Sequence, residues 1–141
     1  MVNPPKDQQV YRMPLRVSRE HIDDLHHVNN VVYVSWVQDV ADAHWKTAAP
    51  EALRAQCRWV VMRHQVDYFI SAVEGDELEL ITWVDAAQGA RSIRHVSIQR
   101  ASDHKVLAYA ETTWCLLDPV SGKPKRVASE IDAVLRSETA E

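Results

Sequence analysis

The C-terminal half of the chain alternates between apolar and polar residues, with short turns between the alternating stretches. Alternation with a period of two is typical of β-strands that bury one face. The pattern predicts four long strands, over 57–70, 77–85, 91–100 and 105–117, separated by turns at 74–76, 86–89 and 101–104. We therefore expect these four strands to form an antiparallel meander.

Two of the four predicted strands carry polar residues where a buried face would be apolar. The 57–70 strand places Val60, Met62, Val66 and Tyr68 on its apolar face, and His64 falls on that same face. A lone histidine on an apolar face usually finds a hydrogen-bond partner in the core, although a substrate contact is the alternative use for it. The 91–100 strand is polar and only weakly patterned.

The N-terminal half predicts a strand followed by a helix. Residues 9–17 alternate from Tyr11 onward, and Pro14 within them indicates an edge strand because proline lacks a backbone donor. The residues at 31–34, Val-Val-Tyr-Val, favour a strand by propensity, but the polar positions that follow indicate a helix over 31–46. These positions form one narrow helical stripe: Ser35, Gln38, Asp39, Asp42 and Lys46.

A helix with so narrow a polar stripe is buried on most of its sides. A short amphipathic helix is expected over 128–136. One long apolar helix and one antiparallel sheet define an α+β fold, in which a long curved sheet wraps around a central and mostly buried helix. Such a single sheet leaves an exposed face or edge, and dimerisation is a natural way to cover it.

Length and composition narrow the class of protein. The 141 residues predict a single domain over 1–141, and the net charge of -4 disfavours nucleic acid as a partner. No apolar run approaches the ~20 residues that a membrane-spanning helix needs. The two cysteines, Cys57 and Cys115, lie in strand-like segments, which predicts two reduced thiols in a cytoplasmic protein.

The densest cluster of polar side chains lies at 23–30, immediately before the long helix. It contains two carboxylates, two imidazoles and two carboxamides, from Asp23, Asp24, His26, His27, Asn29 and Asn30. A carboxylate can attack an acyl carbonyl or activate water, and the free N–H groups at a helix start can stabilise the oxyanion that forms. A nearby histidine can hydrogen-bond the carboxylate or carry a proton.

Two other interpretations of this loop are simpler. An Asp- and Asn-rich loop before a helix is commonly only a helix cap, and either Asn29 or Asn30 could serve as one. A metal site is disfavoured, because adjacent His26 and His27 cannot easily face one ion and no second cluster completes a ligand shell. No Gly-x-Ser-x-Gly motif is present, and Cys57 is remote in sequence from the loop.

The cluster also matches a known signature. The pattern Asp-x-x-x-His-Val-Asn-Asn-x-x-Tyr-x-x-Trp is met by Asp23, His27, Val28, Asn29, Asn30, Tyr33 and Trp36. It resembles the active-site signature of hotdog-fold thioesterases, in the branch of 4-hydroxybenzoyl-CoA thioesterase-like and acyl-ACP thioesterases. The segments 75–78 and 117–124 are similar to that family as well, so the resemblance covers nearly the whole chain.

The resemblance implies a hotdog fold, a homodimer or a dimer of dimers with active sites at the subunit interface, and hydrolysis of an acyl thioester of CoA or acyl carrier protein. It implies Asp23 as the catalytic carboxylate, in preference to Asp24, and the backbone N–H near Asn30 as the oxyanion donor. We expect His27 to assist catalysis. No cofactor and no metal are implied.

We also expect substrate contacts, from Asn29, Tyr33, His64 and Arg91. Phosphates of CoA would be bound by a few basic residues near 91–94 and 123–126, with Arg94 among the candidates. Trp59, Trp83 and Trp114 are expected in the core or at an interface rather than around an acyl chain.

The sequence departs from the family pattern at two points. The residue before the motif histidine is often Gly in bacterial relatives, and here it is His26. Plant acyl-ACP thioesterases carry an Asn two residues before that histidine, and here it is Leu25. Two other functions stay open: a non-catalytic hotdog protein that binds acyl-CoA, and a hotdog dehydratase acting on 3-hydroxyacyl or 2-enoyl thioesters.

Overall fold

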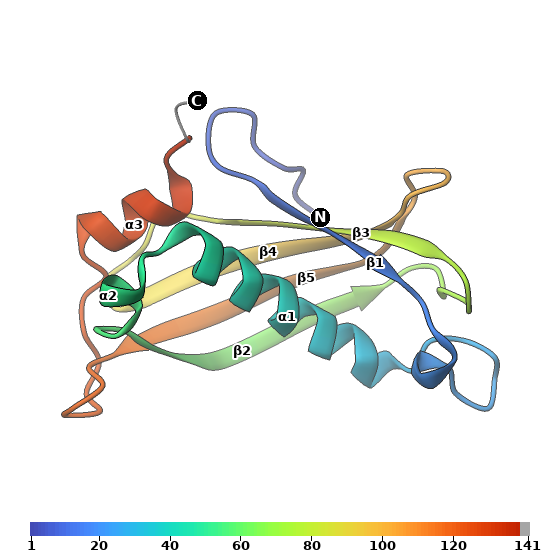
Figure 1. Ribbon diagram of the computed structural model, residues 1–141, viewed down its shortest axis with the longest axis horizontal. Helices are drawn as coiled ribbons and strands as arrows, with labels where there is room; N and C mark the ends of the chain where they lie inside the picture. The colour runs from blue at the N-terminus through green and yellow to red at the C-terminus, as the bar shows by residue number, and fades with distance from the viewer. Residues whose placement is uncertain (139–141) are drawn as a thin grey trace.

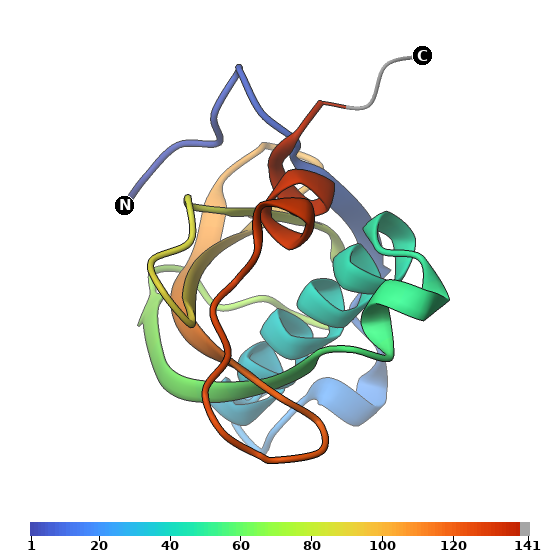
Figure 2. The same ribbon diagram turned by 90° about the vertical axis from the view of Figure 1, so that its left-hand side faces the viewer.

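A curved antiparallel sheet wraps around one long helix in the computed structural model, which describes residues 1–138 (Figures 1 and 2). The strands are β1 (Tyr11–Arg16), β2 (Arg58–Tyr68), β3 (Glu77–Val84), β4 (Arg91–Arg100) and β5 (Val106–Leu117). The helices are α1 (Asn30–Ala48), α2 (Glu51–Arg54) and α3 (Ser129–Arg136), and a 3-10 turn spans Arg19–His21. The α+β class and the central helix are confirmed.

The sheet order is β1-β3-β4-β5-β2, so the prediction of a four-stranded meander was wrong. Only β3, β4 and β5 are consecutive neighbours, and β2 pairs with the far side of β5. The segment 69–76 is the physical reason. It carries the chain across the end of the sheet, where the Ala72 N–H bonds the Tyr33 hydroxyl and the Gly75 N–H bonds the Val17 carbonyl. The long strand β2 is thereby left at the edge.

Helix α1 lies in the concave side of the sheet, and its faces follow the sequence pattern. All five residues of the predicted polar stripe are exposed, whereas Trp36, Val37 and Val40 are buried in the main core. The helix ends at Ala48 because Ala49, which precedes Pro50, is held extended at ψ 130°. At 19 residues the helix is about 28 Å long and reaches along most of the sheet.

Strand β2 contains a β-bulge that the alternation pattern did not reveal. The register with β5 shifts between Val61 and Arg63, so Met62 has no partner and is 53% exposed. The bulge changes which residues face α1: Trp59 faces it before the bulge and His64 after it, as their contacts with Trp45 and Gln38 show. The prediction that Met62 lies on the apolar face was therefore wrong, because one extra residue inverts the alternation.

The outer face of the sheet is also partly covered. Ile81, Trp83 and Tyr109 form a small cluster there, against which Val10 of the N-terminal segment packs. Trp83 is thus a core residue, as predicted. None of the helices within residues 1–138 is long and apolar enough to cross a membrane.

Candidate active site

The 21–30 segment is a small closed hairpin at one end of α1 (Figure 1). Ile22 and Val28 form a β-bridge, the Asp23 N–H donates to the His27 carbonyl at 2.9 Å, and the Asn29 N–H donates to the His21 carbonyl at 3.0 Å. Val28 is buried and its N–H bonds the Ala72 carbonyl. The loop is therefore fixed to the fold at its base, with its polar tip toward solvent.

The Asp23 carboxylate is oriented by the backbone of this hairpin. Its Oδ1 accepts the N–H of Leu25 at 2.9 Å and, more weakly, the N–H of His27 at 3.4 Å. Its Oδ2 has no hydrogen-bond partner among residues 1–138. Asp24, by contrast, is exposed, and its side chain forms no hydrogen bond within the same residues. The hairpin thus holds one carboxylate in place and leaves one of its oxygens available.

His26 explains the departure from the family pattern at the hairpin tip. Its φ is 62°, in the left-handed region where glycine is favoured. Histidine tolerates this region better than most non-glycine residues, so the chain makes a left-handed turn here without Gly. The His26 N–H closes the turn on the Asp23 carbonyl at 3.0 Å. The loop shape therefore does not require glycine at this position.

The start of α1 provides a free backbone donor next to the hairpin. Asn29 is the N-cap, and its Oδ1 accepts the Val31 N–H at 2.9 Å, while its carbonyl accepts the Val32 N–H. The Asn30 N–H has no acceptor in the part of the chain that the structure describes. It lies at the positive end of a 19-residue helix. Of the predicted caps, Asn29 serves that role, and Asn30 presents its N–H.

The other predicted site residues near the hairpin have different surroundings. The His27 side chain is exposed at the hairpin. Tyr33 is only 2% exposed, and its hydroxyl is taken by the Ala72 N–H at 2.9 Å. Burial raises the pKa of Tyr33 above its usual value, so the phenol stays neutral. In this arrangement Tyr33 anchors the 69–76 crossing to α1 and lies beneath the hairpin.

His64 and Arg91 lie away from the hairpin. His64 is half-buried in the middle of β2, where Nδ1 pairs with the Thr112 hydroxyl at 2.9 Å and Nε2 faces Gln38 at 3.4 Å. Burial lowers the pKa of His64, which favours the neutral ring. Arg91 begins β4 and is exposed, opposite Cys115, which in turn pairs with Val60. That row lies about 23 Å along the sheet from Tyr68, whose hydroxyl donates to the Asn30 carbonyl.

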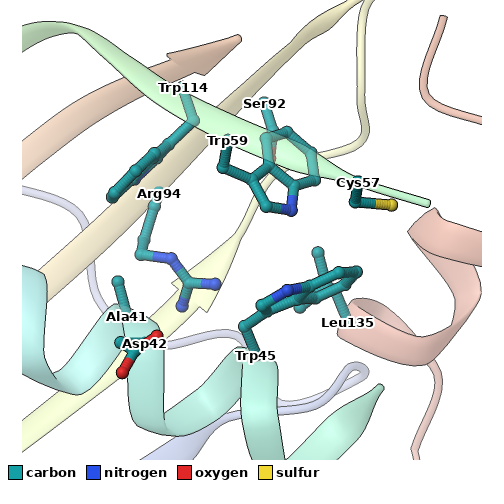
Figure 3. Close-up of a pocket in the computed structure, with 9 residues that line it drawn as sticks. All are labelled: Ala41, Asp42, Trp45, Cys57, Trp59, Ser92, Arg94, Trp114 and Leu135. Atoms are coloured by element: carbon teal, nitrogen blue, oxygen red, sulfur yellow. The ribbon is translucent and has the colours of Figure 1, made fainter. Parts of the chain in front are cut away.

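A pocket of about 250 Å³ lies between the C-terminal half of α1 and the sheet (Figure 3). Three tryptophans line it, from α1, β2 and β5, and the rings of Trp45 and Trp59 meet edge to face at 5.9 Å. The remaining lining residues are Ala41, Asp42, Cys57, Ser92, Arg94 and Leu135. We predicted Trp59 and Trp114 in the core or at an interface rather than around an acyl chain; Trp59 packs against a core cluster, and both residues also line this open pocket.

Arg94 is buried in this pocket at 5% exposure, so it cannot serve as a surface ligand for CoA phosphates as we had predicted. Its Nη1 donates to His44 Nδ1 at 2.9 Å and to the Thr82 hydroxyl oxygen at 3.0 Å. The Thr82 hydroxyl in turn donates a hydrogen bond to the His95 carbonyl, and His44 Nε2 pairs with Gln9 Oε1. We did not predict this network from the sequence. The feature that could have revealed it is the polarity of the 91–100 strand.

Burial sets the charge states of this network. It lowers the pKa of His44 to about 3, with a smaller contribution from the Arg94 charge, so His44 is neutral and accepts at Nδ1. Burial also lowers the pKa of Arg94 to about 9, which still leaves the guanidinium charged at neutral pH. In residues 1–138, no three or more potential metal ligands of the His, Cys, Asp and Glu types come together.

A five-stranded antiparallel sheet around a central helix is the hotdog fold, and solved structures share it. A 1,4-dihydroxy-2-naphthoyl-CoA thioesterase from Synechocystis has a TM-score of 0.79 and 14% identity over 90% of this chain and 96% of that chain. A probable thioesterase from Escherichia coli has a TM-score of 0.78 and 20% identity over 88% and 95% of the two chains. The 12:0-ACP thioesterase from Umbellularia californica has a TM-score of 0.75 and 15% identity over 86% of this chain and 48% of that chain.

The family follows from the sequence itself. Residues 8–135 match the acyl-ACP thioesterase N-terminal domain, which is nearly the whole chain. The chain therefore belongs to the acyl-ACP thioesterase family and is a thioesterase of the hotdog fold. No curated protein matches the sequence.

Proposed function

We propose that this protein hydrolyses acyl thioesters of CoA or acyl carrier protein, with Asp23 as the catalytic carboxylate and the Asn30 N–H as the oxyanion donor. One observation carries the proposal: a single hairpin holds a backbone-oriented carboxylate with a free oxygen and leads into a helix whose first N–H is free. These are the two groups that acyl transfer from a thioester requires.

In the proposed reaction, Asp23 Oδ2 attacks the thioester carbonyl carbon or removes a proton from a water that attacks it. The negative charge that develops on the carbonyl oxygen is stabilised by the Asn30 N–H and the positive end of α1. The carbon–sulfur bond then breaks and the thiolate leaves. Addition of one water gives the carboxylic acid and the free thiol, and His27, exposed beside Asp23, supplies or accepts the proton.

The remaining predicted residues take supporting roles in this proposal. Asn29 fixes the direction of the first N–H groups of α1 through its cap and still has its amide N–H groups for the substrate. Tyr33 supports the hairpin from below through Ala72. His64 lies on the path along α1 and contacts the acyl group, and Arg91 binds a phosphate of the carrier at the surface.

The acyl group, in our proposal, lies in the tryptophan-lined pocket beside α1. Within one chain, Trp59 and Tyr68 stand eight ladder steps apart along β2, once the bulge is discounted, which places the pocket's Trp59 roughly 26 Å from the hairpin end of the strand. A dimer can bring a hairpin and a pocket together from different subunits. If two β2 edges pair antiparallel about their midpoints, the hairpin of one subunit lies beside the pocket of its partner.

Strand β2 supports this mode of assembly. It is 11 residues long, it lies at the sheet edge, and within the described residues no strand pairs with its outer side. Long unpaired edges readily template pairing with another strand. We therefore propose a homodimer with a continuous sheet and two shared active sites, which leaves open a further association into a dimer of dimers.

The test is a hydrolysis assay on a panel of straight-chain and aromatic acyl-CoA and acyl-carrier-protein thioesters, with release of free thiol as the readout. The proposal predicts turnover of at least one class of thioester. Tight binding of acyl-CoA without thiol release would instead support a non-catalytic acyl-CoA-binding protein. Interconversion of 3-hydroxyacyl and 2-enoyl thioesters without thiol release would support a dehydratase.

A further inference from the structure

The buried guanidinium of Arg94 is incompletely satisfied by the protein. Its Nη1 uses both hydrogens, on His44 and Thr82. Its Nη2 and Nε have no acceptor within residues 1–138, which leaves three N–H donors unused. Figure 3 shows the guanidinium pointing from β4 toward α1, into the pocket.

The charge of Arg94 is unpaired as well. It forms no ion pair with any residue in 1–138, although Asp42 lines the same pocket. The Asp42 carboxylate is exposed and pairs with Lys46 at 2.9 Å, one turn further along α1. His44 is neutral and contributes no counter-charge. A buried, uncompensated cation is costly, and this one is held rigidly by two hydrogen bonds on one side only.

The surroundings of Arg94 define what would complement it. Trp45, Trp59 and Trp114 give the pocket apolar walls, while the free Nη2 and Nε hydrogens form a planar fork suited to two oxygens of one carboxylate. Since a water in the liquid occupies about 30 Å³, the pocket of about 250 Å³ has room for roughly eight non-hydrogen atoms. That is enough for four methylenes and a carboxylate.

We propose that Arg94 makes this a specificity pocket for acyl groups that end in a carboxylate, so that the preferred substrates are thioesters of short dicarboxylic acids. The aliphatic part of the acyl chain packs against the tryptophans, and its terminal carboxylate pairs with the Arg94 fork. This inference rests on the proposed function for the placement of the acyl group, and it adds the substrate class.

The first experiment compares adipoyl-CoA with hexanoyl-CoA and suberoyl-CoA with octanoyl-CoA, each pair matched in chain length. Because a hydrogen-bonded ion pair replaces an unpaired buried charge, kcat/KM should favour the carboxylated member by about tenfold to hundredfold. Equal kcat/KM values, or a preference for the uncharged member, in the wild-type protein would overturn the inference whatever the variants do.

The matched variants are Arg94→Met and Arg100→Met. Arg94→Met should abolish the preference and raise kcat/KM for hexanoyl-CoA relative to adipoyl-CoA. Arg100→Met removes a charge from the same strand, where Arg100 pairs with Asp103 at the opposite end, and should leave the preference unchanged. Arg94→Met removes the hydrogen bonds to His44 and Thr82, so Arg94→Lys serves as a second variant if the first does not fold. Lysine keeps the charge but lacks the planar fork, and an intermediate preference is expected.

A binding measurement separates this inference from the proposed hydrolysis. The probes are thioethers, which cannot be hydrolysed: S-(5-carboxypentyl)-pantetheine and S-hexyl-pantetheine, followed by tryptophan fluorescence because three tryptophans line the pocket. Tighter binding of the carboxylated probe without hydrolysis of any thioester would support the pocket and contradict the proposed function. Equal binding of the two probes, or binding of neither, alongside normal hydrolysis would overturn the pocket's specificity and leave the function standing.

Discussion

His26 and His44 show how much a histidine's role depends on its backbone and its surroundings. His26 is exposed and contributes a left-handed turn with φ 62° that shapes the hairpin around Asp23. His44 is fully buried, stacks on Tyr11 with ring centroids 5.3 Å apart, and holds Arg94 through its Nδ1. Nothing in the spacing of the seven histidines distinguishes these roles, because both depend on contacts between residues far apart in sequence.

The buried His44 predicts a specific pH dependence of stability. Its pKa is about 3 in the folded protein against 6.5 ordinarily. The unfolded chain therefore takes up a proton as pH falls through 6.5 while the folded chain does not, so the free energy of unfolding decreases from pH 6.5 down toward pH 3. Between pH 7 and pH 5 the loss from this one group is about 2 kcal/mol.

Denaturant unfolding at pH 7 and pH 5 checks this, with His44→Gln as the matched variant. Glutamine can still accept from Arg94 and donate to Gln9, but it cannot take up a proton. Between pH 7 and pH 5, the free energy of unfolding of the variant should therefore fall by about 2 kcal/mol less than that of the wild type. An identical pH dependence in both proteins would show that His44 is not held neutral by burial.

At the scale of elements, the proposed chemistry depends on the N-terminus of α1, whose direction is set by its cap. Asn29 caps the helix with its side chain, whereas the Asn30 side chain forms no hydrogen bond within the described residues. Asn29→Ala should lower the free energy of unfolding by about 1 kcal/mol and reduce kcat, because the first N–H groups lose their fixed direction. Asn30→Ala keeps the backbone N–H and should retain most of kcat.

Thermal unfolding and steady-state hydrolysis, measured on the two alanine variants in parallel, separate these roles. A large fall in kcat for Asn30→Ala would mean that the Asn30 side chain, and not its N–H, acts on the substrate. Unchanged stability and kcat in Asn29→Ala would mean that the cap does not organise the site.

The elements also show what the sequence could and could not predict. The five polar positions on α1 predicted its exposed stripe correctly, since helix periodicity is local information. Met62 was misplaced because a β-bulge is invisible to a pattern with a strict period of two. The prediction of Arg94 as a phosphate ligand at the surface was wrong, because the partners that bury it are remote in sequence. His44 and Thr82 lie 50 and 12 positions away.

The hairpin around Asp23 was predictable from the sequence only in part. The motif identified Asp23 and Asn30 as candidates, and the structure gives their hydrogen bonds, but the sheet order that brings 69–76 beneath the hairpin was not predictable from alternation. A turn signal at Gly75 is the same whether the chain reverses into a hairpin or crosses to another edge. Long-range pairing decides between the two.

At the scale of the whole molecule, the proposed active site requires a dimer joined along β2. Met62 lies near the middle of that strand and is 53% exposed, so antiparallel pairing about the midpoint brings the two copies of this residue close together. Met62→Asp would place two like charges there and should weaken dimerisation at least about tenfold. The same variant should lose thioesterase activity at low protein concentration, because each proposed site is built from both subunits.

Sedimentation velocity over a range of protein concentrations measures this, with Val2→Asp as the control. Val2 is 52% exposed in the segment before β1, and β1 lies at the opposite edge of the sheet from β2, so the same added charge there should leave the dimer intact. A Met62→Asp protein that remains dimeric at nanomolar concentration would exclude this interface.

Asp23 performs the chemistry in the proposed reaction, and kcat for Asp23→Asn beside that for Asp24→Asn tests this role. Asparagine keeps the Oδ1 acceptor for Leu25, so the hairpin and the dimer should be unchanged, while the nucleophile or base is lost. We predict that kcat falls about a hundredfold or more for Asp23→Asn and stays within about twofold of wild type for Asp24→Asn. A wild-type kcat in a folded, dimeric Asp23→Asn protein would contradict the account.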